Sequence, residues 1–217
     1  GVLGDAVLVN VSTGTPAEAE ASAQHADRLG VRYVTGAVMV PTPMVGTDEC
    51  VVLYAGDPRD LELASPVMAA LGGTSDVVGE DHAVPPALDL AMLDVYFAGM
   101  YAFLHSAALA DAHGIDPTRY LPYAEGIVAT LGGTLPDLTD AITRRTYDGG
   151  EARLDMCLAF LEHIVRTSEQ TGIDPGLAAV VRDASLSAMD RWPGSTDWDV
   201  VAEDLLTSAS STPPSPR

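Results

Sequence analysis

Apolar and polar positions follow different rhythms in the two halves of this chain. Through the first 80 residues, short β-branched apolar runs alternate with helical patterns that end at glycines. The short runs predict buried strands, and the periodic stretches between them predict helices. The expected strands cover 6–11, 33–40, 51–55 and a short strand or turn at 76–79, and the expected helices cover 16–29 and 58–71. Strands and helices in alternation are typical of a parallel α/β layer.

The start of the first helix has a clear local signature. Thr15 can accept a hydrogen bond from the first turn, Pro16 suits the first helical position, and Glu18 follows three residues after the cap. This helix is expected to end at Gly30.

Beyond the proline pair at 85–86 the pattern becomes helical throughout. The segment 86–112 is an unbroken apolar-periodic stretch, which as a helix would be about 40 Å long. Because this helix is apolar nearly all round, it must be buried on most faces, and this favours a dimer with interlocked helices. Further helices are expected at 117–132, 136–146, 151–171, 174–190 and 197–207, and 208–217 has the composition of a disordered tail.

Charge and composition exclude several functions. The chain has 217 residues and a formal net charge of -20, and all 11 basic residues are arginines. Without lysine, Schiff-base chemistry, a P-loop lysine and a lysine general acid are excluded within this chain. The acidity disfavours nucleic acid and anionic membranes as partners.

Other sites and segments are not expected. The sequence contains no uninterrupted run of about 18 apolar residues, so no membrane helix is expected. The first residues do not resemble a signal peptide. The distant Cys50 and Cys157 are expected to be free buried thiols in a reducing, cytoplasmic environment. The histidines lack metal-ligand spacing, and no Gly-x-Gly-x-x-Gly follows a strand.

A series of short motifs carries a family resemblance. In chain order these are Val9–Pro16, Gly36–Pro41 running into Pro43–Thr47, Leu53–Gly56, Leu71–Gly73, Gly79–Asp81, Leu88-Asp89, and Ile164–Glu169 with Gly172. In this order they resemble imine reductases, within the β-hydroxyacid dehydrogenase and 6-phosphogluconate dehydrogenase superfamily. The likeness covers about residues 5–207.

The resemblance implies a fold and an activity. Residues 1–82 would be the C-terminal part of a Rossmann-like α/β domain, and 83–207 a helical dimerisation and substrate domain. The dinucleotide fingerprint would lie upstream, so this chain alone is expected to bind NADPH weakly and to be inactive. The whole protein would be an NADPH-dependent homodimer that reduces the C=N bond of small, often cyclic, imines.

Asp89 is the most informative position in this comparison. The superfamily carries a catalytic lysine on the long helix, six residues after a glycine, and the corresponding positions here are Asp89 and Ala83. Imine reductases have Asp or Tyr in place of that lysine. Asp89 could balance an iminium charge or donate the proton to the imine nitrogen. Alternatively it stabilises the first turn of its helix by its charge.

Three residues are expected to face the cofactor. Asn10 lies at a strand end, where ligands gather in parallel sheets. Ser12 and Thr13 correspond to the loop that approaches the nicotinamide in the superfamily. Helix capping is the alternative role for this pair.

The expected substrate residues come from three segments. On the long helix, Met92 and Tyr96 share a face with Asp89, and Phe97 holds the place of a tyrosine found in relatives with the aspartate. Because Tyr96 lies one position before the place of that tyrosine, a packed aromatic is the preferred interpretation of this residue. Met39 is a further candidate, since by the resemblance it stands in a stretch that is Pro-Val-Ser in the superfamily, and loss of that serine suits an apolar amine. The remaining candidates are Met156 and Cys157, which could also be plain core. By the resemblance, the last two line the pocket of the partner subunit.

Two other functions remain open from the sequence. The chain could belong to a β-hydroxyacid dehydrogenase-like oxidoreductase with altered chemistry. It could also be a non-catalytic helical dimerisation module with a vestigial α/β layer.

Overall fold

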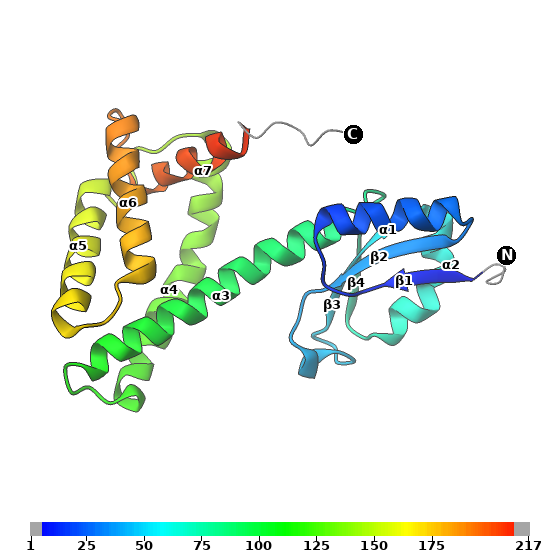
Figure 1. Cartoon of the computed structure of the whole chain (residues 1–217), viewed down its shortest axis with the longest axis horizontal. Helices are drawn as coiled ribbons and strands as arrows, with labels where there is room; N and C mark the ends of the chain where they lie inside the picture. Colours follow the sequence, from blue (N-terminus) through cyan, green and yellow to red (C-terminus); the bar gives the residue numbers. More distant parts are fainter. Residues whose placement is uncertain (1–5, 211–217) are drawn as a thin grey trace. The chain divides into compact units, whose positions relative to one another are not determined.

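A four-stranded sheet with the order β1-β2-β3-β4 organises the first part of the chain (Figure 1). The computed structural model describes residues 6–210, and the chain divides into two compact units at 99/100. The strands are β1 (Val7–Asn10), β2 (Arg32–Val38), β3 (Val51–Gly56) and β4 (Thr74–Gly79). All four expected strands are present.

The sheet is mixed, so the expectation of a wholly parallel layer was wrong. The pairs β1–β2 and β3–β4 are parallel, whereas β2–β3 is antiparallel. A parallel pair needs a crossover, usually a helix, to bring the chain back. Between β2 and β3 the chain forms only a short 3-10 turn, Thr42–Met44, so it returns in the opposite direction. The amide of Met39 donates to the Val51 carbonyl at 2.8 Å and extends this hairpin.

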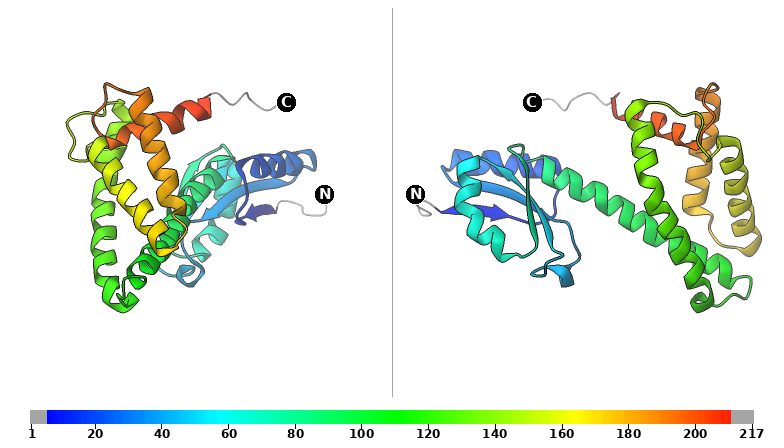
Figure 2. Two further views of the ribbon diagram at one scale, coloured as in Figure 1. Left: turned by 60° about the vertical axis from the view of Figure 1, so that its left-hand side comes forward. Right: turned by 180° about the vertical axis from the view of Figure 1, so that it is seen from behind.

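Helices α1 (Pro16–Arg28) and α2 (Pro58–Ala70) lie on either side of the sheet (Figures 1 and 2). The predicted capping box of α1 is confirmed, because Thr15 and Glu18 exchange hydrogen bonds. The core between sheet and α2 is formed by Val34, Cys50, Val52, Tyr54, Leu61, Ala64 and Met68. Since side chains alternate along a strand, Tyr33 and Thr35 face the opposite side from Val34.

Helix α3 (Val84–Asp111) begins two residues before its expected start at residue 86 and runs across the division at 99/100. A domain boundary at residue 82 stays a prediction. Only Pro85, Pro86 and Asp89 of this helix are buried. By length and composition alone α3 could cross a membrane, which the sequence analysis did not expect; one such helix is a weak indication, since core helices share these properties.

The second unit is helical. It contains α4 (Pro117–Arg144), α5 (Leu154–Thr171), α6 (Gly176–Arg191), a 3-10 turn at Trp198–Val200 and α7 (Val201–Ser210). The two expected helices at 117–132 and 136–146 are one helix with Pro136 inside it. An interior proline removes one backbone hydrogen bond and crowds the carbonyl four residues before it, but α4 continues through Pro136 nonetheless. The predicted tail 208–217 begins too early, since α7 includes 208–210; residues 211–217 lie outside the described range.

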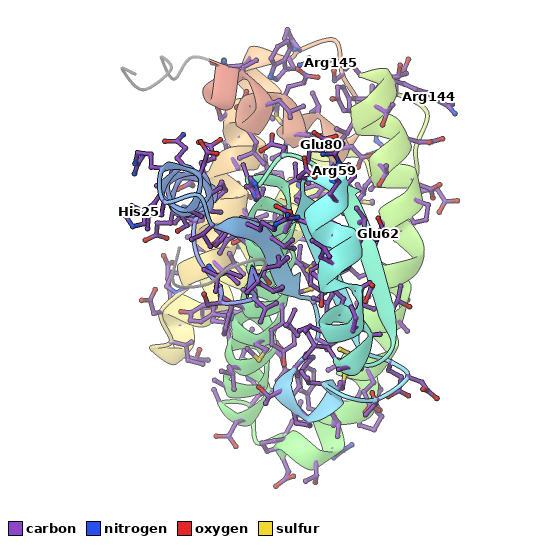
Figure 3. All side chains as sticks on the ribbon, turned by 90° about the vertical axis from the view of Figure 1, so that its right-hand side faces the viewer. His25, Arg59, Glu62, Glu80, Arg144 and Arg145 are labelled. Atoms are coloured by element: carbon purple, nitrogen blue, oxygen red, sulfur yellow. The ribbon has the colours of Figure 1, made fainter. Side chains whose placement is uncertain are left out.

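An ionic cluster joins the end of α4 to α7. Arg145 ends α4 in the left-handed conformation (φ 51°). Its Nε donates to Glu203 at 2.8 Å, its Nη2 forms an ion pair with the same carboxylate, and the Tyr147 hydroxyl donates to Glu203 at 2.7 Å. These donors lower the pKa of Glu203 to about 2, and burial raises the pKa of Tyr147 to about 12. Its neighbour Arg144, labelled with it in Figure 3, pairs with Asp140 on the surface.

Candidate functional site

Asp89 is a buried carboxyl group on α3. Only 2% of the residue is exposed. Burial raises its pKa, and a hydrogen bond from the Thr13 side chain partly opposes the rise. Because α3 begins at Val84, Asp89 lies in the second turn, beyond the part of the helix where the amino-terminal charge acts strongly. A purely helix-stabilising role in the first turn is therefore not supported.

A polar pocket of about 350 Å³ lies in front of Asp89, within the first unit. It is built from the end of β1, the start of α1, the middle of β2 and the start of α3. The residues that line it are Asn10, Ser12, Thr13, Gly14, Thr15, Glu18, Ala19, Ser22, Thr35, Gly36, Ala37, Pro86 and Asp89. The three expected cofactor residues, Asn10, Ser12 and Thr13, thus line one pocket with the expected catalytic residue. The roles of all four residues stay predictions.

The loop after β1 is held by its own side chains. The Asn10 Oδ1 accepts from the Ser12 amide at 3.1 Å and from the Ser12 hydroxyl at 2.5 Å. The Asn10 Nδ2 donates to the Tyr33 hydroxyl at 2.9 Å. The cap of α1 is Thr15, so Ser12 and Thr13 do not cap that helix. The Ser12 hydroxyl instead donates to Asn10, and the Thr13 side chain forms a hydrogen bond with Asp89.

Sequence reasoning missed Thr35 in this pocket. Thr35 is 4% exposed and lies beside Asn10 in the parallel register of β1 and β2. The available signal was a polar residue inside an otherwise apolar strand. Its hydroxyl lies 2.9 Å from the Nδ1 of His82, another residue that the sequence did not single out for this site.

The expected substrate residues do not line this pocket. Met39 and Met92 are half-buried, while Tyr96 and Phe97 are exposed, with their rings edge-to-face at 5.8 Å. Packing of Tyr96 within a core is therefore not seen.

The remaining two expected residues belong to the second unit. Met156 is exposed and Cys157 half-buried, in the first turns of α5. Cys157 and the fully buried Cys50 are both free thiols. A substrate role for Met156 and Cys157 stays a prediction. Among residues 6–210, no group of three metal-ligating side chains is placed to hold an ion.

Comparisons with known proteins agree with this arrangement. The family described as "NADPH-dependent reductive aminase-like, C-terminal domain" matches residues 81–207. An NADPH-dependent reductive aminase from Aspergillus oryzae is 27% identical over 200 residues, which is 90% of this chain and 68% of that protein.

Solved structures give the same result. An imine reductase from Bacillus cereus superposes with a TM-score of 0.84 at 31% identity, covering 92% of this chain and 70% of that one. An imine reductase from Myxococcus stipitatus in complex with NADP+ has a TM-score of 0.86 at 26% identity over the same shares. The expected succession of a Rossmann-type α/β part, a long helix and a helical part is thereby confirmed. The chain belongs to the NADPH-dependent reductive aminase-like family of imine reductases.

Proposed function

We propose that the protein reduces the C=N bond of a small imine, with Asp89 as the proton donor. The observation that carries this proposal is a buried carboxyl group with a raised pKa facing a polar pocket, in a chain of this family. Because burial favours the protonated form of this carboxyl group, it can protonate a nitrogen as electrons arrive at the neighbouring carbon.

The pocket fits the uncharged end of a nicotinamide cofactor. Its lining offers the side-chain amide of Asn10 and the hydroxyls of Ser12 and Thr13, and it contains no arginine for a phosphate. When bound, NADPH supplies the hydride for the carbon of the C=N bond. Asn10 and Ser12 would hold its carboxamide side, since both sit at the carboxyl end of β1, where ligands of such sheets bind.

Asp89 completes the reaction on the nitrogen side. Its carboxyl proton moves to the imine nitrogen while the C=N π bond breaks, leaving an amine and a carboxylate. Thr13 donates to that carboxylate, which stabilises the charged form that the transfer creates. Solvent then returns a proton to Asp89.

The substrate class follows from the relatives. A reductive aminase from Aspergillus terreus has been solved with NADPH and ethyl levulinate, and another structure holds cyclohexanone and allyl amine. We propose small ketones with amines, or the preformed cyclic imines, as substrates here. We propose a cytoplasmic location, which would suit the two free thiols.

A homodimer with interlocked helices would cover apolar surface that the single chain leaves open. On α3, Val95 is 67% and Leu104 65% exposed, and on α4 Ile127 is 65% exposed. Large exposed apolar surfaces are typical of interaction sites. Met156 and Cys157 would then reach the partner's pocket. Light scattering that gives the mass of one chain in solution would overturn this part of the proposal.

The test is imine reduction by the full-length protein, followed as loss of NADPH absorbance with a cyclic imine such as a pyrroline. Asp89→Ala and Asp89→Asn should each lower kcat at least about a hundredfold, the usual effect of removing a general acid. Asp94→Asn, an exposed carboxylate on the same helix, is the matched control and should leave the rate unchanged. Near-normal rates in both Asp89 variants would remove this residue from the mechanism.

Two outcomes would point to the other functions. Turnover of a β-hydroxy acid without turnover of any imine would indicate the dehydrogenase-like activity. A dimer that neither binds NADPH nor turns over either substrate would indicate a dimerisation module.

A further inference from the structure

His82 makes two contacts with β2 from its place just before α3. Its Nδ1 lies 2.9 Å from the Thr35 hydroxyl. Its ring packs against the Tyr33 ring, with centroids 5.7 Å apart and planes inclined at 54°. Tyr33 and Thr35 are 7% and 4% exposed and lie on the same face of the strand. The half-buried His82 side chain thus spans two buried residues of β2.

Both contacts lead to the wall of the polar pocket. Thr35 lines the pocket directly. The hydroxyl of Tyr33 accepts from the Asn10 side-chain amide at 2.9 Å, and Asn10 in turn holds Ser12. Removing the imidazole would therefore free the Thr35 hydroxyl and one face of the Tyr33 ring, and would loosen the anchor of Asn10.

Asp81, the residue before His82, caps the start of α3. The Oδ1 of Asp81 accepts from the Ala83 amide at 2.9 Å, and its carbonyl accepts from the Val84 amide at 3.2 Å. His82 stands between this cap and the helix, so its ring attaches the first turn of α3 to β2. Asp89 follows in the next turn and points to the same pocket.

The neutral imidazole suits this place. Burial lowers the pKa of His82, and the nearby Asp81 offsets this only in part. The Nδ1 of a neutral ring can accept from the Thr35 hydroxyl or donate to it, whereas in a charged ring it could only donate.

We propose that His82 is a positioning residue of the site: it holds Thr35 and, through Tyr33, Asn10, and so sets the part of the pocket wall that β1 and β2 form beside Asp89. That this wall receives the nicotinamide rests on the proposed function. The imidazole itself takes no part in the reaction, since its contacts are with β2.

Four variants of the full-length protein test this assignment. His82→Phe keeps a ring against Tyr33 and removes Nδ1, His82→Asn keeps a polar atom near Nδ1, and Thr35→Val removes the hydroxyl. His113→Phe, at an exposed histidine after α3, is the control. The dissociation constant for NADPH, measured by fluorescence, is the first readout.

His82→Phe and Thr35→Val should each weaken NADPH binding roughly five- to tenfold, the effect of one lost hydrogen bond. The double variant should be no weaker than either single variant, because both remove the same interaction. His82→Asn should recover most of the affinity. In kinetics, KM for NADPH should rise with kcat nearly unchanged, whereas a folding defect would lower kcat through loss of active protein. Wild-type affinity in His82→Phe, or additive effects in the double variant, would overturn the assignment.

A second readout needs no cofactor. The side-chain amide signals of Asn10 in NMR spectra should shift and exchange faster with water in His82→Phe, and stay in place in His82→Asn and His113→Phe. If the wild-type protein fails to bind NADPH, the proposed function falls, while unchanged Asn10 signals in His82→Phe would separately refute the role of His82.

Discussion

Thr13 and Asp89 come from opposite ends of the α/β unit's sequence and share a hydrogen bond across the polar pocket. The Thr13 hydroxyl stabilises the ionised carboxylate, whereas burial favours the protonated form. The balance between these two effects sets the pH at which Asp89 gives up its proton, and it can be changed at Thr13 without touching the carboxyl group.

Thr13→Val should move the pH profile of kcat. Without the donor, the pKa of Asp89 rises further, so the loss of activity on the alkaline side, where the acid is spent, should begin at higher pH. Thr13→Ser, which keeps the hydroxyl, is the control and should keep the wild-type profile. An alkaline limb that does not move in Thr13→Val would show that this limb belongs to another group.

Asp89→Asn should stabilise the folded protein at neutral pH by on the order of 1 kcal/mol, because burial in the folded state opposes an ionisation that the unfolded state permits, and Asn has no such cost. The raised pKa means that the folded state binds a proton more tightly than the unfolded state. Ionisation of Asp89 therefore costs stability as pH rises above the ordinary aspartate pKa of about 3.9. The advantage of Asp89→Asn should vanish below that pH. Urea unfolding of wild type and variant across this range measures it, and an advantage independent of pH would contradict the account.

Glu203→Gln should destabilise the protein by about 1–3 kcal/mol at neutral pH, since Arg145 and Tyr147 lose a buried charged acceptor. The pKa of Glu203 in the folded state, about 2, lies below its usual 4.5, so this stability is present above the ordinary pKa and is lost as pH falls from there toward 2. The difference between wild type and Glu203→Gln should therefore shrink through that window. Arg144→Ala breaks a surface pair of Asp140 and serves as the control, with an expected effect of about 0–1 kcal/mol.

Tyr54→Phe should be neutral or stabilising by up to about 1 kcal/mol. Among the described residues, the Tyr54 hydroxyl is buried without a hydrogen-bond partner, so its removal loses no interaction and relieves desolvation. Tyr33→Phe is the matched comparison. The Tyr33 hydroxyl accepts a hydrogen bond from Asn10, so its removal should lower the stability of the folded protein. Thermal melting of the two variants should separate them, and equal losses of stability would contradict the assignment.

The features that could be predicted from the sequence are those that depend on residues close together in the chain. The capping box at Thr15 and Glu18 needs only neighbouring residues, so it was readable. Asp89 stood out only by comparison with a family that holds lysine there. Thr35 and His82 were missed because their meeting depends on strand register and on how the chain enters α3.

Two errors of the sequence analysis have a common origin. The antiparallel direction of β3 and the continuation of α4 beyond Pro136 both depend on packing against the rest of the fold. Periodicity reports which positions are apolar and does not report the direction of the next strand. Burial of α3 was expected from its composition, but in the single chain most of the helix is exposed. In the proposed dimer, the partner would cover this exposed surface.

The reversal of β3 affects how the pocket can treat charged ligands. Because β3 runs against β2, Gly56 pairs with Val34, and α2 leaves the sheet in the direction opposite to α1. The positively polarised amino ends of α1 and α2 therefore cannot converge on one anion. Of these two helices, α1 directs its amino end, through Thr15, to the pocket, which the start of α3 also lines. With Asp89 and Glu18 in the same wall, this region is suited to a neutral or cationic group, as an iminium nitrogen is, and repels free inorganic anions.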